Sequence, residues 1–119
     1  MLLKSVDLFT GVGGITLALT GVARPVAYCD VDEGARACIR HNIELGLLPR
    51  ARIHDDVRKL TNPPRADMVV GGSPCVGHSS RGNRRGFEED QSALFFDMLR
   101  VLDECGADAI FIETVPQIV

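Results

Sequence analysis

Cys75 is the residue whose setting most clearly indicates chemistry. It ends the segment Gly71–Cys75 (Gly-Gly-Ser-Pro-Cys), which directly follows the apolar run Met68–Val70. A buried strand would deliver the thiol into a glycine-rich turn, and Pro74 would stiffen the backbone just before it. A cysteine held in this way at the end of a sheet can act as a nucleophile. Since a lone cysteine is more often a small core residue, the choice depends on whether the chain also supplies a cofactor and a proton donor.

The elements that must position this thiol alternate between short apolar runs and segments of helical periodicity. The expected strands are, in chain order, Leu2–Phe9, Val26–Asp30, Arg52–Asp56, Ala66–Gly72 and Ala107–Glu113. The expected helices are Ile15–Leu19, a segment around Ala35–Ile43, and a third that begins near Leu94 and is closed by Gly106. The polar stretch Ser73–Glu89 is expected to form a loop. This order predicts an α/β fold with a doubly wound, mostly parallel sheet of about five strands.

Length and composition set the limits of any function. The chain has 119 residues, 45% of them hydrophobic and 24% charged, which describes one ordinary globular domain. Its net charge of −3 gives no overall basic field, so any contact with nucleic acid must be local. The four cysteines are spread out, with no Cys-x-x-Cys pair and no histidines at zinc spacing, which favours a reduced intracellular compartment and no metal. The apolar runs are too short to span a bilayer, so no membrane contact is expected.

Polar or otherwise special residues follow each expected strand. A glycine turn, Gly11–Gly14, follows the first strand, and the remaining strands end at or just before four residues: Asp30, Asp56, Cys75 and Glu113. In a parallel sheet these carboxyl ends meet at one edge, where ligands bind. Tight turns and solvated acids would explain each position separately, but five in order favour a site. A glycine turn plus an acid suits any adenosine cofactor, so this pattern leaves both a nicotinamide and S-adenosylmethionine open.

Taken together, these motifs resemble the N-terminal catalytic half of the DNA (cytosine-5) methyltransferase family. Asp7–Gly14 (Asp-Leu-Phe-Thr-Gly-Val-Gly-Gly) resembles the family's first cofactor motif, and Gly72–Cys75 resembles its nucleophile motif. Residues 82–97 resemble the catalytic loop and the helix after it. Glu113-Thr114-Val115 stands where the family has Glu-Asn-Val. The resemblance covers nearly the whole chain in the family's order, as one partial catalytic domain over residues 1–119.

The resemblance implies a methyl transfer from S-adenosylmethionine to C5 of cytosine. Cys75 would add to C6 of the base, and Glu113 would protonate or hydrogen-bond N3. The implied cofactor contacts are Phe9, Gly11, Gly13, Gly14, Asp30, Val31, Asp56, Val57, Gly72, Pro74 and Leu94. The implied substrate contacts are Ser79, Arg81, Arg84 and Arg85, in a loop that would close on phosphates of a flipped-out target. DNA is favoured over RNA as the substrate, in the cytoplasm if the source is a prokaryote or phage.

Several positions depart from the family's pattern. Asp30 stands where Glu is usual, Val76 replaces a Gln, His78 replaces an aromatic residue, and Thr114 replaces an Asn. The family's later motifs and its target-recognition domain have no counterpart within these 119 residues. We therefore expect a complementary subunit or C-terminal segment. The alternatives are a truncated or excerpted enzyme, and a catalytically inactive S-adenosylmethionine-binding remnant or interaction module.

Overall fold

The protein folds around one five-stranded parallel sheet. The computed structural model describes residues 2–9, 11, 13–72 and 84–113, with the backbone alone described over 84–92. The strands run in the order β3-β2-β1-β4-β5, and every pair of neighbours is parallel. Their bounds are β1 (Leu3–Leu8), β2 (Ala23–Cys29), β3 (Arg52–His54), β4 (Met68–Gly71) and β5 (Ala109–Ile112). This confirms the predicted fold class, with each strand within a few residues of its expected position.

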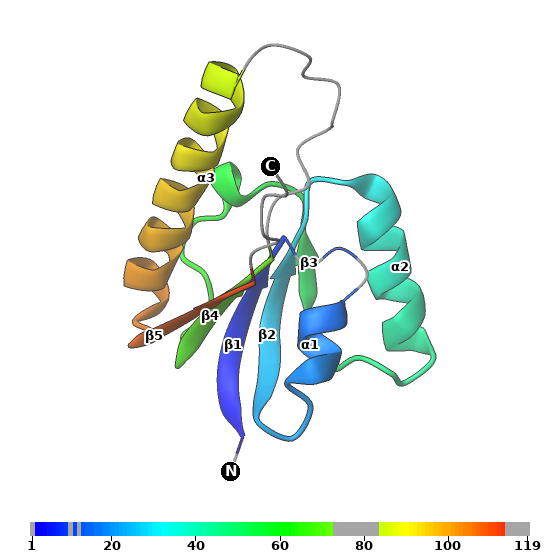
Figure 1. Ribbon diagram of the computed structural model, residues 1–119. Coiled ribbons are helices and arrows are strands. Elements are labelled where there is room, and N and C mark those ends of the chain that lie inside the picture. The colour runs from blue at the N-terminus through cyan, green and yellow to red at the C-terminus, as the bar shows by residue number, and fades with distance from the viewer. Residues whose placement is uncertain (1, 10, 12, 73–83, 114–119) are drawn as a thin grey trace.

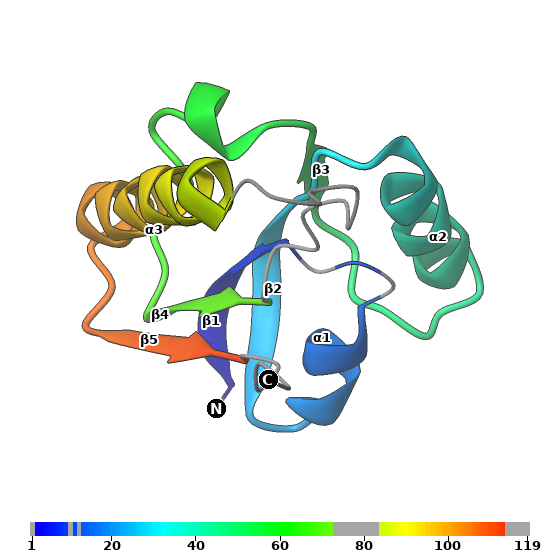
Figure 2. The ribbon, with the colours of Figure 1, turned by 45° about the horizontal axis from the view of Figure 1, so that its top comes forward.

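Helices cover both faces of the sheet, as Figures 1 and 2 show. The helical elements are α1 (Gly14–Ala18), α2 (Glu33–Glu44), the 3-10 turn η1 (Val57–Lys59) and α3 (Arg84–Cys105). Because side chains alternate along a strand, Val6 and Leu8 of β1 point to the α3 side, whereas Asp7 between them points to α1. The sheet therefore separates a core under α3 from smaller clusters under α1 and α2.

Strand β2 begins at Ala23, three residues before the expected start at Val26. Pro25 lies within the added residues, and proline cannot donate a hydrogen bond within a sheet. In the structure the β1–β2 register shifts here: Ser5 pairs with Pro25, and Val6 pairs with Ala27. The shift leaves Val26 as an extra residue, and such a bulge is where a sheet accommodates proline.

Helix α3 begins at Arg84, so the expectation of a loop through Glu89 is wrong for residues 84–89. The expected start near Leu94 rested on apolar periodicity, which is absent from the polar N-terminal turns. Arginine, glutamate and glutamine are good helix formers, and residues 84–93 contain one glycine and no proline to interrupt them. A polar helix can thus extend ahead of its packed apolar face.

The described residues contain no helix that is both long and apolar enough to cross a membrane.

Truncation of Ile39 tests the packing of α2 on the sheet. Ile39 is fully buried in a cluster with Tyr28 and Leu48. We expect Ile39→Ala to lower the free energy of unfolding by about 2–5 kcal/mol, since it removes buried methyl groups and leaves a cavity. Leu45→Ala is the control, because Leu45 is 58% exposed, and its effect should stay within about 0.5 kcal/mol. Urea denaturation measures both, and equal effects would contradict this packing.

Candidate functional site

Backbone segments from three strands meet at the carboxyl edge of the sheet. The N–H of Gly72 donates to the Leu8 carbonyl at 3.1 Å, and the N–H of Glu113 donates to the Gly71 carbonyl at 2.9 Å. A Cβ on Gly72 would lie 2.5 Å from the Phe9 carbonyl oxygen, so only glycine fits this contact. Phe9 itself has a left-handed φ of 55°, rare for a residue with a side chain. The structure therefore brings the predicted site residues Phe9, Gly72 and Glu113 side by side.

Asp30 ties the glycine turn to the start of α2. Its Oδ2 accepts the N–H of Gly11 at 2.8 Å, and its Oδ1 accepts the N–H of Asp32 at 2.9 Å. The Asp30 backbone N–H donates to the last residue of β3, at the His54 carbonyl. Asp30 is 8% exposed, so these bonds form where water offers little competition. One carboxylate thus joins the turns that come after β1 and β2.

Asp32 and Arg36 support Asp30, although the sequence reasoning did not select either as a site residue. Asp32 caps α2 by accepting the N–H of Ala35 at 2.8 Å. Arg36 donates from Nη1 to the carbonyls of Asp30 and Val31, both at 2.9 Å. The capping role was readable from an aspartate just before the helical run. The role of Arg36 could not be read from the sequence, because it depends on helix α2 directing the Arg36 side chain back over the loop before the helix.

Asp7, which precedes the glycine turn in the chain, holds α1 against β1. Its carboxylate is 1% exposed and accepts the hydroxyl of Thr16 at 2.5 Å and that of Ser5 at 2.6 Å. Burial raises the pKa of Asp7 above its ordinary value, and the two hydroxyl hydrogen bonds oppose that rise only in part. The turn between Phe9 and α1 is thus held in its middle by Asp30, through Gly11, and the helix after it is held by Asp7, through Thr16.

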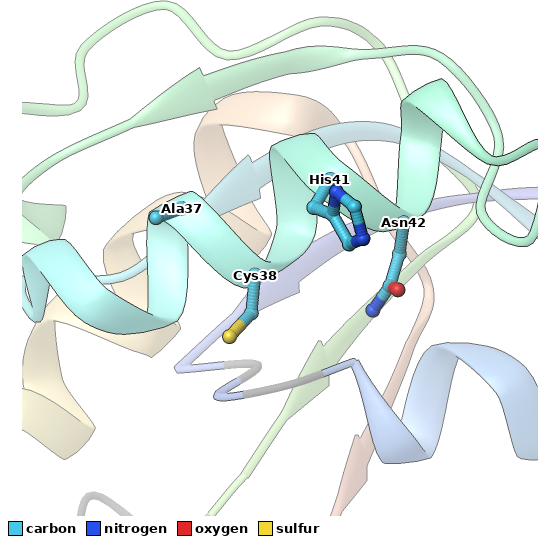
Figure 3. Close-up of a pocket in the computed structure, with 4 residues that line it drawn as sticks. All are labelled: Ala37, Cys38, His41 and Asn42. Carbon is cyan, nitrogen blue, oxygen red and sulfur yellow. The ribbon is translucent and has the colours of Figure 1, made fainter.

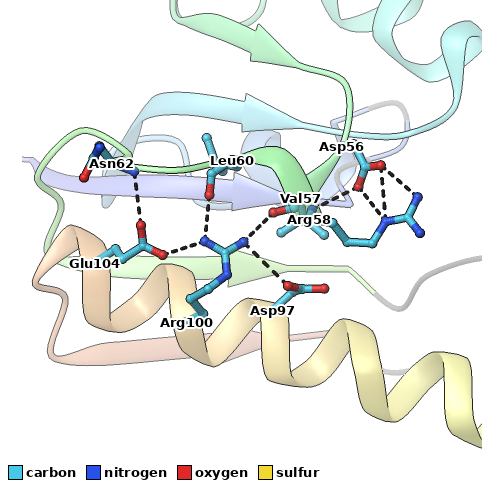
Figure 4. Close-up of polar contacts among 8 residues, drawn as sticks. All are labelled: Asp56, Val57, Arg58, Leu60, Asn62, Asp97, Arg100 and Glu104. Carbon is cyan, nitrogen blue, oxygen red and sulfur yellow. Dashed lines mark hydrogen bonds and ion pairs between the residues drawn. The ribbon is translucent and has the colours of Figure 1, made fainter.

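Asp56 comes after β3 and faces Arg58. The two side chains form an ion pair at 2.8 Å, and the backbone N–H of Arg58 also donates to Asp56 Oδ1 (Figure 4). These hydrogen bonds hold the pKa of Asp56 below its ordinary value. A ligand that donates to Asp56 would therefore share or displace the Arg58 guanidinium. The neighbouring Val57 is buried, with 3% exposure, and its side chain packs into the core under α3.

The remaining predicted site residues fall into four groups. Val31 is 67% exposed beside Asp30, and Gly13 and Gly14 begin α1 next to Asp7's partner Thr16. Leu94 is partly buried against the α3 core, which Phe9 also contacts. Arg84 and Arg85 form the start of α3, where only the backbone is described. The predicted residues Pro74, Cys75, Ser79 and Arg81 lie outside the described residues.

The cysteines that the structure describes differ in setting. Cys29 is 1% exposed, and burial, with the nearby carboxylates of Asp56 and Asp30, raises its pKa to about 12. Burial also raises the pKa of Cys105. Both thiols stay protonated near neutral pH, so they are core residues and poor nucleophiles.

Cys38 is the exposed one of these three cysteines. It lines a surface hollow of about 330 Å³ on α2 with Ala37, His41 and Asn42. Figure 3 shows the Cys38 and Asn42 side chains extending from the same side of this helix. No group of three or more metal-binding side chains occurs here or elsewhere among the described residues.

This doubly wound sheet, with a glycine turn and acids at its carboxyl edge, defines a cofactor-binding α/β protein. A family model described as "C-5 cytosine-specific DNA methylase" matches residues 3–119, so the chain belongs to that family. It is 34% identical over 116 residues to "Type II methyltransferase M.CviJI" of Paramecium bursaria Chlorella virus IL3A, covering 95% of this chain and 30% of the relative. It is 33% identical over 114 residues to "Type II methyltransferase M.HhaI" of Haemophilus parahaemolyticus, covering 95% and 34%. The chain thus spans about a third of the length of these relatives.

Solved structures agree on the fold. The S. pombe Dnmt2 methyltransferase matches with a TM-score of 0.57 and 21% identity, covering 94% of this chain and 34% of that one. The "DhpI-SAM-HEP complex" matches with a TM-score of 0.53 and 19% identity, covering 84% and 41%. At these identities the likeness shows a shared Rossmann-like methyltransferase fold.

Replacement of Asp7 by asparagine gives a pH test of its burial. A carboxyl whose pKa is raised by folding stabilises the protein fully below its unfolded pKa of 3.8, and this contribution is lost as the pH rises through the folded pKa. We therefore expect the stability of the wild type relative to Asp7→Asn to be greatest near pH 3.5 and to decline toward pH 7. Urea denaturation of both proteins across this range measures the difference. A difference that stays constant or grows with pH would contradict the burial.

Proposed function

We propose that this chain binds S-adenosylmethionine at the carboxyl edge of the sheet and supplies the nucleophile and the acid for methylation of cytosine C5 in DNA. The observation that carries the proposal is the family match over residues 3–119, joined to the meeting of Phe9, Gly72 and Glu113 at one edge. Action on DNA would place the protein inside the cell.

The described residues fit a nucleoside cofactor. Each Asp30 carboxylate oxygen accepts one backbone N–H, and each retains a free lone pair that could accept a ribose hydroxyl. A Cβ at Gly11 would meet no atom within 4 Å, so there is open space beside the turn. Val31 offers an exposed apolar side chain next to Asp30. These features support the cofactor contacts that the sequence predicts at Gly11, Asp30 and Val31.

The chemistry asks two things of the chain. Cytosine C5 is a weak nucleophile, so the Cys75 thiolate would add to C6 while Glu113 donates to N3, which places electron density on C5. S-adenosylmethionine, when bound, supplies an electrophilic methyl group to that carbon. Loss of the C5 proton then breaks the C6–S bond and returns the thiolate of Cys75. The base must leave the duplex stack before the thiol can reach it.

A complementary C-terminal segment or subunit would cover the β5 side of the sheet. Five large apolar side chains of α3 and β5 are between 37% and 68% exposed: Phe95, Phe96, Leu99, Phe111 and Ile112. Within the described residues β5 is an edge strand, and an exposed apolar edge favours association with another segment. The curated relatives are about three times as long as this chain, so they contain further sequence that could cover such a surface.

Reconstitution with the C-terminal part of a cytosine-5 methyltransferase tests the proposal. We expect methyl transfer from the combined enzyme and none from the 119-residue chain. Cys75→Ala should lower activity on the order of 10³-fold or more and abolish the covalent adduct with a 5-fluorocytosine duplex, since no other nucleophile replaces the thiol. Glu113→Gln should lower the rate about 10²–10⁴-fold, as expected for a lost general acid.

Cys38→Ala is the matched control, because Cys38 is an exposed thiol on α2. Its activity and its adduct, measured by mass spectrometry, should equal those of the wild type. Equal activity with Cys75→Ala would refute the assigned nucleophile. Cofactor binding without an adduct in any reconstituted enzyme would instead favour a non-catalytic S-adenosylmethionine-binding module.

A further inference from the structure

Arg100 connects α3 to the segment that carries two of the predicted cofactor residues. Its guanidinium donates from Nη2 to the Val57 carbonyl at 2.6 Å and from Nη1 to the Leu60 carbonyl at 2.8 Å (Figure 4). Val57 begins η1, directly after Asp56. A planar guanidinium with fixed donor directions can hold two carbonyls at once, which an ammonium group cannot do with the same geometry.

Glu104 on α3 fixes the guanidinium in place. Glu104, one turn further along the helix, contacts Arg100 Nη1 at 2.5 Å, and Asp97 lies 3.5 Å from Nη2. Glu104 also accepts the backbone N–H of Asn62 at 3.1 Å, where the chain adopts a left-handed φ of 49°. Arg100 and Glu104 therefore bind the chain from Val57 to Asn62 at three backbone points.

Two side chains of this segment pack into the core, while its backbone is held from α3. Val57 and Leu60 are buried in the core under α3, and the Arg58 side chain is 68% exposed and forms an ion pair with Asp56. Without Arg100 the Leu60 carbonyl would lose its guanidinium donor at the edge of the core, and the Val57 carbonyl would keep the N–H of Leu60. The position of Asp56 along the sheet edge therefore depends on how firmly the segment after it is tied to α3.

We propose that Arg100 is a positioning residue for cofactor binding. It touches none of the predicted cofactor contacts through their side chains. It holds the 57–62 segment so that Asp56 and Val57 stay at the carboxyl edge beside Asp30. This inference rests on the proposed S-adenosylmethionine site. It also couples that site to α3, the helix that comes after the segment containing Cys75.

Two readouts test the proposal on the full 119-residue chain. The first is hydrogen exchange at the Lys59 and Leu60 amides, which donate within the segment to Asp56 and Val57. In Arg100→Met we expect these amides to exchange about tenfold faster, because two charge-assisted hydrogen bonds are lost, while the core amides of Val6 and Val69 stay at the wild-type rate. The second is the S-adenosylmethionine Kd by calorimetry, which should rise about tenfold if the competent conformation falls to about a tenth of the population.

Matched variants separate positioning from general stability. Arg100→Lys keeps the charge but lacks the planar fork that holds both carbonyls in fixed directions, so its exchange rates and Kd should fall between those of the wild type and Arg100→Met. Asp97→Asn removes a neighbouring charge and leaves both carbonyl bonds, so it should match the wild type in both readouts.

Each outcome decides one part of the account. Unchanged exchange at Lys59 and Leu60 in Arg100→Met would overturn the tether. Faster exchange with an unchanged Kd would overturn the positioning role and leave the proposed function intact. A wild-type chain that binds no S-adenosylmethionine would overturn the cofactor assignment and the positioning role with it, while the exchange rates would still report the tether.

Discussion

The rest of the site depends on the contact between the ends of β1 and β4. These strands are neighbours, yet after them the chain leaves toward opposite faces, to α1 after β1 and to α3 after the segment that contains Cys75. Gly72 lies against the Phe9 carbonyl so closely that a Cβ would approach it to 2.5 Å. Because the chain leaves the ends of β1 and β4 toward opposite faces, a crevice opens between the two segments. Doubly wound proteins bind ligands in a crevice of this kind. The predicted cofactor turn and the predicted nucleophile segment therefore start from the same place.

Charged side chains fix the turns at the carboxyl ends of the first three strands. Asp30 holds the middle of the turn after β1, Asp7 holds the helix that follows this turn, and Arg36 holds the turn after β2. Arg100 does the same after β3 by reaching across from α3. Burial of Asp7 disfavours its charged form, so this carboxylate is retained at a cost in stability that its two hydroxyl hydrogen bonds only partly offset. Burial of the Asp7 carboxylate therefore lowers the stability of the fold while it helps to fix the backbone at the carboxyl edge.

The sequence predicted the parallel fold and the order of the site, because strand periodicity, glycine turns and terminal acids are local patterns. In the structure Asp30 lies beside the glycine turn and Glu113 lies beside Gly71. The sequence reasoning missed the start of α3, since polar helical turns carry no apolar signal. It also gave no indication of the tethers made by Arg36 and Arg100. The Arg36 tether depends on the direction of its side chain over the loop before α2, and the Arg100 tether joins residues that are 43 positions apart and meet only on folding. The roles of all the predicted site residues stay predictions, and Cys75, Pro74, Ser79 and Arg81 also lie outside the described residues.

The central claim is that the carboxyl edge of the sheet binds S-adenosylmethionine. An NMR titration of the isotope-labelled chain with S-adenosylhomocysteine tests it most directly, since backbone amides report the site without requiring catalysis. The account predicts shifts at Gly11, Val31, Val57 and Gly72, with none at Ala66, which lies before β4 at the opposite edge. Shifts confined to that opposite edge or to the α2 hollow, or no shifts at all, would contradict it.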